Sequence, residues 1–413
     1  MNIYAIIILS TIIFGYLLDL IADQMNLKAL DPIVPDEFKD IYDDEKYSKS
    51  QEYTTVKTKF GFVISIFNLV LLLGFWSLGG FNLLDRIVRA WDLNVIFTGL
   101  LYIGILVMVK KLLSIPFSIY SIFVIEERFG FNKTTWKTFF FDFIKSILIS
   151  VVIGGLFLGG ILAFFEYIGK LAWLYAWGAT VIFTFIMQVV YPTFIMPLFN
   201  KFLPLEDGDL RDSIMTYAKS VEFPLQNIFV MDGSKRSTKS NAFFTGFGRQ
   251  KRIVLFDTLI EKHSVPELVA VLAHEVGHFK KKHVIKGTIL SIIQNGFMFF
   301  LLSIFLRHKG LFDAFFVENM SIYVGLILFG MLYSPISMIL SIFSGMFLRK
   351  IEYEADRFAL DTFGDKDSMI NALKNLAKDN LSNLTPHPFY VFLNYSHPPI
   401  LKRIKELRGA PHL

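Results

Sequence analysis

The sequence of 413 residues contains no cysteine, which excludes disulfides, catalytic thiols and thiolate metal ligands. Charged residues make up only 19% of the chain, below the roughly 25% of ordinary soluble domains. The net charge is a modest +5 and no basic cluster indicates a nucleic-acid partner. Apolar residues are abundant, at 54%, and include 45 phenylalanines. A soluble protein of this size could not hide so much apolar surface, so we expect an integral membrane protein.

Seven segments are apolar enough to cross a bilayer, which requires about 20 residues. They are residues 3–21, 60–84, 93–125, 146–165, 171–200, 287–306 and 321–348. The first lacks a basic n-region and a small-x-small cleavage site, so we expect a retained helix and not a signal peptide. Prolines 116, 192, 197 and 335 are expected to kink their spans. The polar residue Asn68 could line a cavity at membrane depth or make a helix–helix contact.

Lysine and arginine in the short loops predict the orientation of the spans. They concentrate in the loops after the first and third spans, which places the N-terminus outside and the C-terminus in the cytosol. Two water-soluble stretches, residues 201–286 and 349–413, then both lie on the cytosolic side. The first has an α+β pattern, with a helix predicted at 209–220 and strands at 228–231 and 253–256.

The strongest chemical motif is the His-Glu-Val-Gly-His segment at 274–278. It lies on a predicted helix whose start is marked by the Ser-Val-Pro-Glu segment at 264–267, which forms a capping box. His274 and His278 share a helix face, so their imidazoles can take adjacent corners of a zinc tetrahedron. Glu275 can then act as general base on a zinc-activated water. The weaker interpretation is a polar helix face with two hydrogen-bonded histidines.

Catalytic zinc requires a third protein ligand and an open fourth position. His283 follows the motif at the wrong offset to be that ligand. Glu352 and Asp356 share a helix face, so Glu352 can bind zinc while Asp356 accepts a hydrogen bond from a ligating histidine. Glu354 points to another face. Alone, this pattern is more typical of a solvated acidic helix end; beside the histidine motif it favours a zinc site.

A third candidate is the histidine–arginine pair His397 and Arg403 near the C-terminus. Two such groups could stabilise the oxyanion of a tetrahedral intermediate. Spacing alone, however, favours a surface turn before an amphipathic helix.

Together these residues resemble the integral-membrane zinc metalloproteases called CAAX prenyl proteases, the type known from yeast a-factor maturation. The similarity runs nearly end to end. It is carried by residues 75–82, 127–132, 197–202, 240–246, 251–258, 274–278, 352–356 and 396–399. This set, in this order and with seven spans, is far more specific than the zinc motif alone.

The resemblance implies that His274, His278 and Glu352 bind one zinc ion. It gives Glu275 the role of catalytic base, and Asp356 that of a carboxylate orienting a ligand.

The resemblance also places His397 and Arg403 near the scissile carbonyl, which reverses the interpretation from spacing. Asn241, Ala242 and Phe243 would belong to an edge strand that holds an extended substrate by β-augmentation.

We therefore expect an all-α polytopic membrane protein, with seven transmembrane helices enclosing a chamber and a small α+β zinc metalloprotease domain on the cytosolic side. Residues 1–200 would hold spans one to five with their loops. Residues 201–286 would form the cytosolic protease segment with the zinc-motif helix. Residues 287–348 would hold spans six and seven, and residues 349–413 would complete the active site.

The expected activity is that of a zinc endopeptidase cleaving near the C-terminus of prenylated CaaX-type or other membrane-associated substrates. Its expected partners are a peptide or protein substrate and membrane lipid. A Lys-, Ile- and Phe-rich composition, and a C-terminus without a dilysine signal, favour a bacterial inner membrane over the endoplasmic reticulum. Bacteria generally do not prenylate proteins, so one alternative is a quality-control zinc protease without prenyl specificity. Others are an inactive zinc-bound scaffold, which would not need Glu275, and a transporter or channel.

Overall fold

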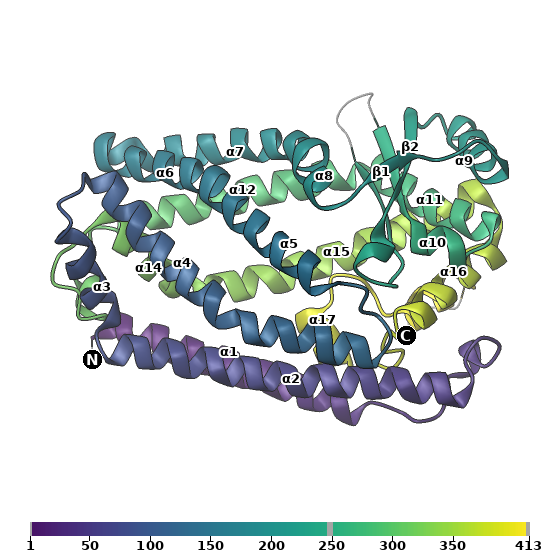
Figure 1. Cartoon of the computed structure of the whole chain (residues 1–413), viewed down its shortest axis with the longest axis horizontal. Coiled ribbons are helices and arrows are strands. Elements are labelled where there is room, and N and C mark those ends of the chain that lie inside the picture. The colour runs from purple at the N-terminus through teal and green to yellow at the C-terminus, as the bar shows by residue number, and fades with distance from the viewer. Residues whose placement is uncertain (1, 246–250, 410–413) are drawn as a thin grey trace.

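The computed structural model describes residues 2–245 and 251–409. Long helices dominate it, and a small sheet with shorter helices lies at one end of them (Figure 1). Two parts of the sequence named above lie outside the described residues. They are Gly246, the last residue of the segment 240–246, and residues 410–413, which belong to the C-terminus that lacks a dilysine signal.

Six helical stretches of the described chain are long and apolar enough to cross a membrane. They are Ile3–Lys28 (α1), Asp44–Ser77 (α2), Val95–Glu126 (from α4, Val95–Tyr120), Trp136–Tyr167 (α5, Trp136–Ile149, and α6, Gly155–Tyr167), Gly169–Phe199 (α7, Ala172–Val190, and α8, Met196–Phe199) and His283–Phe305 (α12). The seventh candidate is a pair of helices, α14 (Ile322–Leu332) and α15 (Ser334–Phe363), bent by 55° where they meet. The predicted polytopic helical fold is thereby confirmed.

The second predicted span, 60–84, starts inside a longer helix, but its predicted end is wrong. The helix already begins at Asp44, capped by the side chain of Asp43, and ends at Ser77. Gly79 then adopts a left-handed conformation with φ of 68°, and a separate helix, α3 (Gly80–Arg89), follows. The hydropathy of a segment indicates its affinity for the membrane but not the backbone turn that one glycine permits. The predicted span therefore combined the end of one helix with the start of the next.

The predicted proline kinks have different outcomes. Pro116 lies inside α4, which continues past it. Pro192 lies in a π-helical turn, Tyr191–Ile195. Pro335 occupies the first turn of α15, directly after the 55° bend. Proline suits this position because the first turn has no intrahelical partner for its missing N–H.

A four-stranded sheet forms the centre of the water-soluble part, in the order β1-β2-β4-β3. Its strands are β1 (Phe202–Pro204), β2 (Leu225–Met231), β3 (Ala242–Thr245) and β4 (Lys251–Phe256). The pair β2–β4 is parallel and the other two pairs are antiparallel, which leaves β3 at an edge. The predicted strands lie within β2 and β4, and the predicted helix is α9 (Asp209–Ser220).

Helix α11 (Val265–Lys280) carries the zinc motif and lies in the core beside the sheet. Its predicted capping box is present, with the Ser264 N–H donating to Glu267 Oε2 at 3.0 Å. The remaining helices are α10 (Asp257–Lys262), α13 (Lys309–Asp313), α16 (Lys366–Asp379), α17 (Pro388–Asn394) and α18 (Ile400–Leu407). Helix α11 contacts α15, α16 and α9, so the motif is held by segments distant in sequence.

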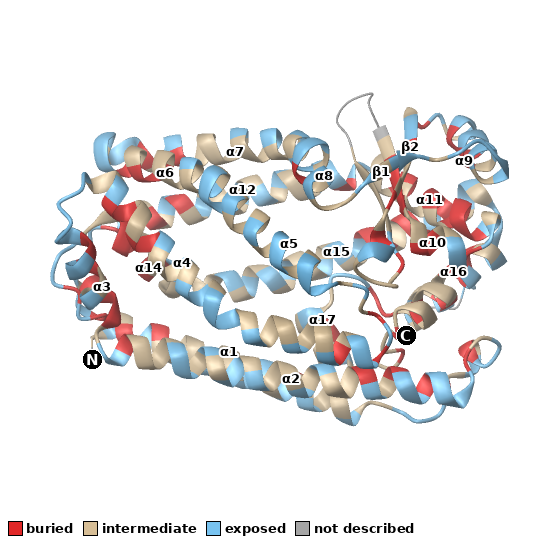
Figure 2. Ribbon diagram, in the orientation of Figure 1, coloured by how far each residue is buried: buried red, intermediate tan, exposed pale blue. Residues whose placement is uncertain are grey.

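Besides a small cluster around Tyr53, Ile125 and Phe129, the described residues form two hydrophobic cores, which lie at opposite ends of the long helices (Figure 2). One lies around the sheet, α11 and α16, and the other lies around α3, α14 and the adjoining helix ends. Between them, the helix midsections contain no buried residue over 9–21, 54–75, 104–124, 132–160, 177–194, 284–298 and 334–350. The long helices are therefore joined into closely packed cores mainly at their two ends, and the predicted chamber stays a prediction.

Candidate active site

His274 and His278 of α11 converge with Glu352 of α15 into one cluster. One ligand atom from each residue lies within 4.8 Å of the other two. His278 Nε2 is 3.3 Å from Glu352 Oε1, and His274 Nε2 is 3.5 Å from Glu352 Oε2. The helices can approach closely because Gly277 has no side chain where α11 meets Ala355 of α15.

The chemistry of this cluster fits a zinc ion. The Nε2 atoms of His274 and His278 lie only 3.1 Å apart and face the same carboxylate. Glu352 Oε2 is buried and no described residue makes a well-aligned hydrogen bond to it, although His397 Nδ1 lies 2.9 Å away. Two imidazole nitrogens and one carboxylate oxygen are a donor set typical of catalytic zinc.

Asp356 and Arg403 support His274 from behind the cluster. His274 Nδ1 lies 2.8 Å from Asp356 Oδ1, and Arg403 donates to both oxygens of the same carboxylate. Burial alone lowers the pKa of His274, but the hydrogen bonds with Asp356 and Glu352 outweigh it and raise the pKa to about 9. Nδ1 is committed to Asp356, so Nε2 is the atom left for a metal.

Glu275 lines a hollow of about 160 Å³ together with His274, Glu352 and Asp356. Burial raises the pKa of the Glu275 carboxyl, against the opposing effect of the neighbouring imidazoles. The side chain of Glu275 therefore borders the space where a peptide bond would have to meet the metal.

His397 and Arg403 both line this hollow, but in different ways. His397 Nδ1 is 2.9 Å from Glu352 Oε2 and its side chain is 66% exposed, so it can meet a substrate. Only 12% of the Arg403 side chain is exposed, and its guanidinium is paired with Asp356. This arrangement indicates a positioning role for Arg403. The sequence analysis did not predict the ion pair between Arg403 and Asp356, although a buried carboxylate such as Asp356 requires a cation or several hydrogen-bond donors.

The predicted substrate strand borders the same hollow. Asn241 and Ala242 line it, and β3 begins at Ala242 on the edge of the sheet. Phe243 does not line the hollow, because successive residues of a strand face opposite sides and Ala242 faces the hollow. Its ring instead lies 6.4 Å from that of Phe256.

Two further residues, His283 and Glu354, adjoin the histidine cluster, although the sequence analysis did not assign them to it. His283 Nδ1 lies 3.1 Å from His278 Nδ1, and His283 Nε2 lies 3.1 Å from Glu354 Oε2. The spacing had placed both outside the predicted ligand set. It carried no signal for their contact, which depends on the turn between α11 and α12.

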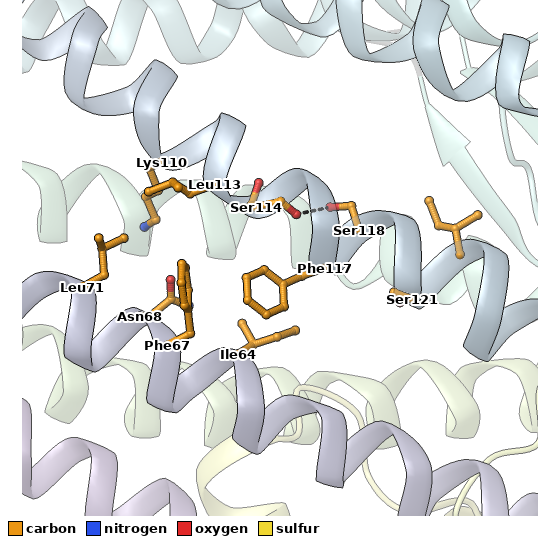
Figure 3. A pocket seen from close by; sticks show the side chains of 11 residues that line it. Ile64, Phe67, Asn68, Leu71, Lys110, Leu113, Ser114, Phe117, Ser118 and Ser121 are labelled. Carbon is orange, nitrogen blue, oxygen red and sulfur yellow. Dashed lines mark hydrogen bonds between the residues drawn. The ribbon is translucent and has the colours of Figure 1, made fainter.

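A separate groove of about 400 Å³ lies between α2 and α4 (Figure 3). Its walls are mostly apolar and include Ile64, Phe67 and Phe117, while Asn68 and Lys110 add polar groups. Asn68 therefore lines a cavity, one of the two positions predicted for it. The groove shares no lining residue with the hollow at the histidine cluster, so we assign it to the helical region.

The membrane-spanning helices, together with a buried His-His-Glu cluster beside Glu275, define an integral-membrane metallopeptidase. Residues 23–201 match a family model described as "CAAX prenyl protease N-terminal, five membrane helices", and residues 204–410 match peptidase family M48. The chain belongs to the CAAX prenyl protease group of peptidase family M48.

Similar proteins agree with this assignment over nearly the whole chain. The probable CAAX prenyl protease 1 of Schizosaccharomyces pombe is 36% identical, across 88% of this chain and 80% of that protein. The CAAX prenyl protease 1 homolog of Arabidopsis thaliana is 35% identical, across 97% of both. The crystal structure of S. mikatae Ste24p superposes with a TM-score of 0.91 at 35% identity, covering 98% of this chain and 99% of that one. The predictions of family, zinc dependence and membrane-embedded proteolysis are confirmed.

Proposed function

We propose that this protein cleaves peptides near their C-terminus, with prenylated CaaX-type chains as its substrates. The observation that carries the proposal is the convergence of His274, His278 and Glu352 beside Glu275, in a hollow that the edge strand β3 borders. The names of the relatives, CAAX prenyl proteases, support this substrate class.

In this proposal His274 and His278 hold the zinc ion through Nε2, and Glu352 holds it through its carboxylate. Zinc, when bound, supplies Lewis-acid polarisation of the scissile carbonyl and of the attacking water. Asp356 and Arg403 fix the orientation of the His274 ring, because the bidentate pair holds the carboxylate in one plane.

The remaining residues handle the substrate and its protons. The free edge of β3 pairs with the extended peptide backbone, with Asn241 and Ala242 facing the reaction. Glu275 takes a proton from the attacking water and returns it to the amine that leaves when the peptide C–N bond breaks. The exposed ring of His397 stabilises the charge that develops on the carbonyl oxygen.

We also propose that the end of the molecule bearing the histidine cluster faces the cytosol. The concentration of lysine and arginine in the loops after the first and third predicted spans supports this orientation. Membrane lipid then surrounds the spans and nucleic acid has no role. The expectation of a bacterial inner membrane rests on the sequence alone and stays a prediction.

The decisive experiment compares wild-type protein with Glu275→Gln in detergent. Each preparation is tested on a farnesylated CaaX peptide and its unprenylated twin, with zinc content measured by mass spectrometry. We expect Glu275→Gln to retain one zinc per chain and lose cleavage, because it keeps the ligands and removes the base. Substantial cleavage by a clean preparation of the variant would contradict the mechanism.

The same assay separates the alternatives. Chelator-sensitive cleavage of the prenylated peptide alone supports CaaX processing. Equal cleavage of both peptides would indicate a quality-control protease without prenyl specificity. A wild-type protein that binds zinc and cleaves neither would indicate a scaffold.

A further inference from the structure

A second chain of hydrogen-bonding groups reaches the histidine cluster, opposite the chain formed by Asp356 and Arg403. It runs from His278 through His283 to Glu354, with 3.1 Å between the two Nδ1 atoms and 3.1 Å between His283 Nε2 and Glu354 Oε2. Lys286 Nζ lies 3.8 Å from the same Glu354 oxygen. His274 is thus backed directly by a carboxylate that has a cationic neighbour, whereas His278 reaches such a carboxylate through His283.

The hydrogen atoms of this chain can be assigned from the role of His278 Nε2. Nε2 faces Glu352 and His274, so it must offer a lone pair if it is to bind a metal. His278 Nδ1 then carries the proton and donates to His283 Nδ1. His283 in turn carries its own proton on Nε2 and donates to Glu354, so one set of tautomers satisfies every contact.

The local fold builds this contact. Lys282, between α11 and α12, adopts a left-handed conformation with φ of 58°, which turns the chain so that α12 starts at His283. The His283 side chain is 1% exposed, so its ring is held by its surroundings. Glu354 lies two residues after Glu352 on α15, on a different face of that helix.

His283 is not itself positioned as a ligand. Its Nδ1 faces Nδ1 of His278, on the side of that ring away from Nε2, and its Nε2 faces Glu354. A histidine that ligates zinc through Nε2 commonly donates its Nδ1–H to a neighbouring acceptor, which fixes its tautomer and ring orientation. His274 has such an acceptor in Asp356, and the acceptor for His278 is His283.

We propose that His283 and Glu354 are positioning residues for the zinc ligand His278, with His283 accepting from His278 Nδ1 and Glu354 holding the His283 ring. The proposal rests on the ligand set proposed above. It extends that set with two residues that tie α12 and the outer face of α15 to the metal site.

The test measures zinc affinity directly, by competition with a chromophoric chelator, in full-length protein in detergent. His283→Leu should weaken zinc binding by about 10–100-fold, because His278 loses its acceptor. His283→Gln should restore most of the affinity, since its amide oxygen can accept the same hydrogen bond. Glu354→Leu should have a smaller effect, and the double variant should be no worse than His283→Leu alone.

The matched control is Arg357→Met, which removes an exposed ion pair with Asp361 on the same helix. It should change zinc affinity by less than about twofold, since exposed pairs contribute little. The visible absorption of cobalt-substituted protein gives a second measure, because it reports ligand geometry. It should change in His283→Leu and not in Arg357→Met.

Two outcomes would overturn the proposal. Unchanged zinc affinity and cobalt spectrum in His283→Leu, with an equal fall in the melting temperature of zinc-free and zinc-loaded protein, would show a purely structural role. No recovery of zinc affinity in His283→Gln would exclude the accepted hydrogen bond as the cause. A ligand set that is itself wrong gives a different result, because His278→Ala would then retain zinc.

Discussion

Arg403 and Asp356 form a bidentate ion pair, with Nε donating to Oδ2 at 2.7 Å and Nη2 to Oδ1 at 2.6 Å. The same Oδ1 atom lies 2.8 Å from Nδ1 of His274. Three helices, α18, α15 and α11, therefore meet through one carboxylate. A bidentate pair fixes both the plane and the position of its acceptor, so the C-terminal helix controls the orientation of a residue in the zinc motif.

Arg403→Met should weaken zinc binding by about 10–100-fold, because Asp356 loses the cation that holds it against His274. It should also destabilise the protein by about 3–5 kcal/mol, the usual result of leaving a buried charge unpaired. Zinc titration and thermal unfolding measure the two effects. Arg408→Met, which removes an exposed pair with Glu37, is the control and should change neither appreciably. A fall in kcat with wild-type zinc affinity would instead assign Arg403 to the oxyanion.

His397→Ala should lower kcat by about 10²–10³-fold, the usual cost of removing a donor to an oxyanion. Zinc affinity should fall much less than kcat, because the three ligands and the Asp356–Arg403 pair are intact and only the contact of His397 with Glu352 is lost. Steady-state kinetics and zinc content on one preparation check this, with the neighbouring Lys402→Gln as control. A loss of zinc that accounts for the loss of activity would contradict the prediction.

Gly277→Ala should disturb the metal site although it leaves every ligand in place. A Cβ atom there would lie 3.0 Å from the carbonyl oxygen of Ala355, so α11 and α15 would have to separate. Overpacking of this kind costs about 1–3 kcal/mol. We expect a lower melting temperature and weaker zinc binding.

The matched control for this change is Gly287→Ala in α12, where an added Cβ meets nothing within 4 Å. This variant should be neutral or stabilised by up to about 1 kcal/mol, because alanine is the better helix former. Equal effects of the two substitutions would show that the close approach of α11 to α15 at Gly277 is not required for stability or zinc binding.

His263 predicts an acid-sensitive step in stability. Its ring is fully buried, and neither nitrogen makes a hydrogen bond within the described part of the chain. Burial lowers the pKa of His263 below its ordinary value of 6.5, against the opposing effect of Glu267 and Asp379. The unfolded chain therefore binds the proton first, and stability that is present above pH 6.5 is lost as the pH falls below it.

Melting temperatures between pH 8 and pH 5 test this expectation. Wild-type protein should lose stability towards pH 5, and His263→Leu should show a flatter profile because it has no proton to bind. His308→Gln, at an exposed histidine, should keep the wild-type slope. Parallel profiles for wild type and His263→Leu would exclude His263 as the titrating group.

The parts of the site that could be predicted depend on local sequence. The capping box at Ser264 and Glu267 fixed the start of α11, and helical periodicity placed His274 and His278 on one face. Periodicity likewise paired Glu352 with Asp356. Each of these arguments uses residues within one or two turns of a helix, where geometry is almost independent of the rest of the fold.

The parts that could not be predicted depend on backbone turns and long-range contacts. The left-handed conformation of Gly79 divided a predicted span, and that of Lys282 brought His283 to His278. The pairing of Arg403 with Asp356 joins two segments whose relative position no local pattern encodes. Sequence named Arg403 correctly as a residue of the site but could not say which group it would contact.

The helix midsections, which contain no buried residue, affect how this protein can vary. In either terminal core a change in side-chain volume must be absorbed by close-packed neighbours. Along the midsections that constraint is weaker, although close contacts such as that of Gly296 with Trp177 remain. The size and polarity of the surfaces that these helices present can thus be changed by single substitutions that leave both cores intact. These surfaces and the stability of the fold are set largely by different residues, so one can change while the other is kept.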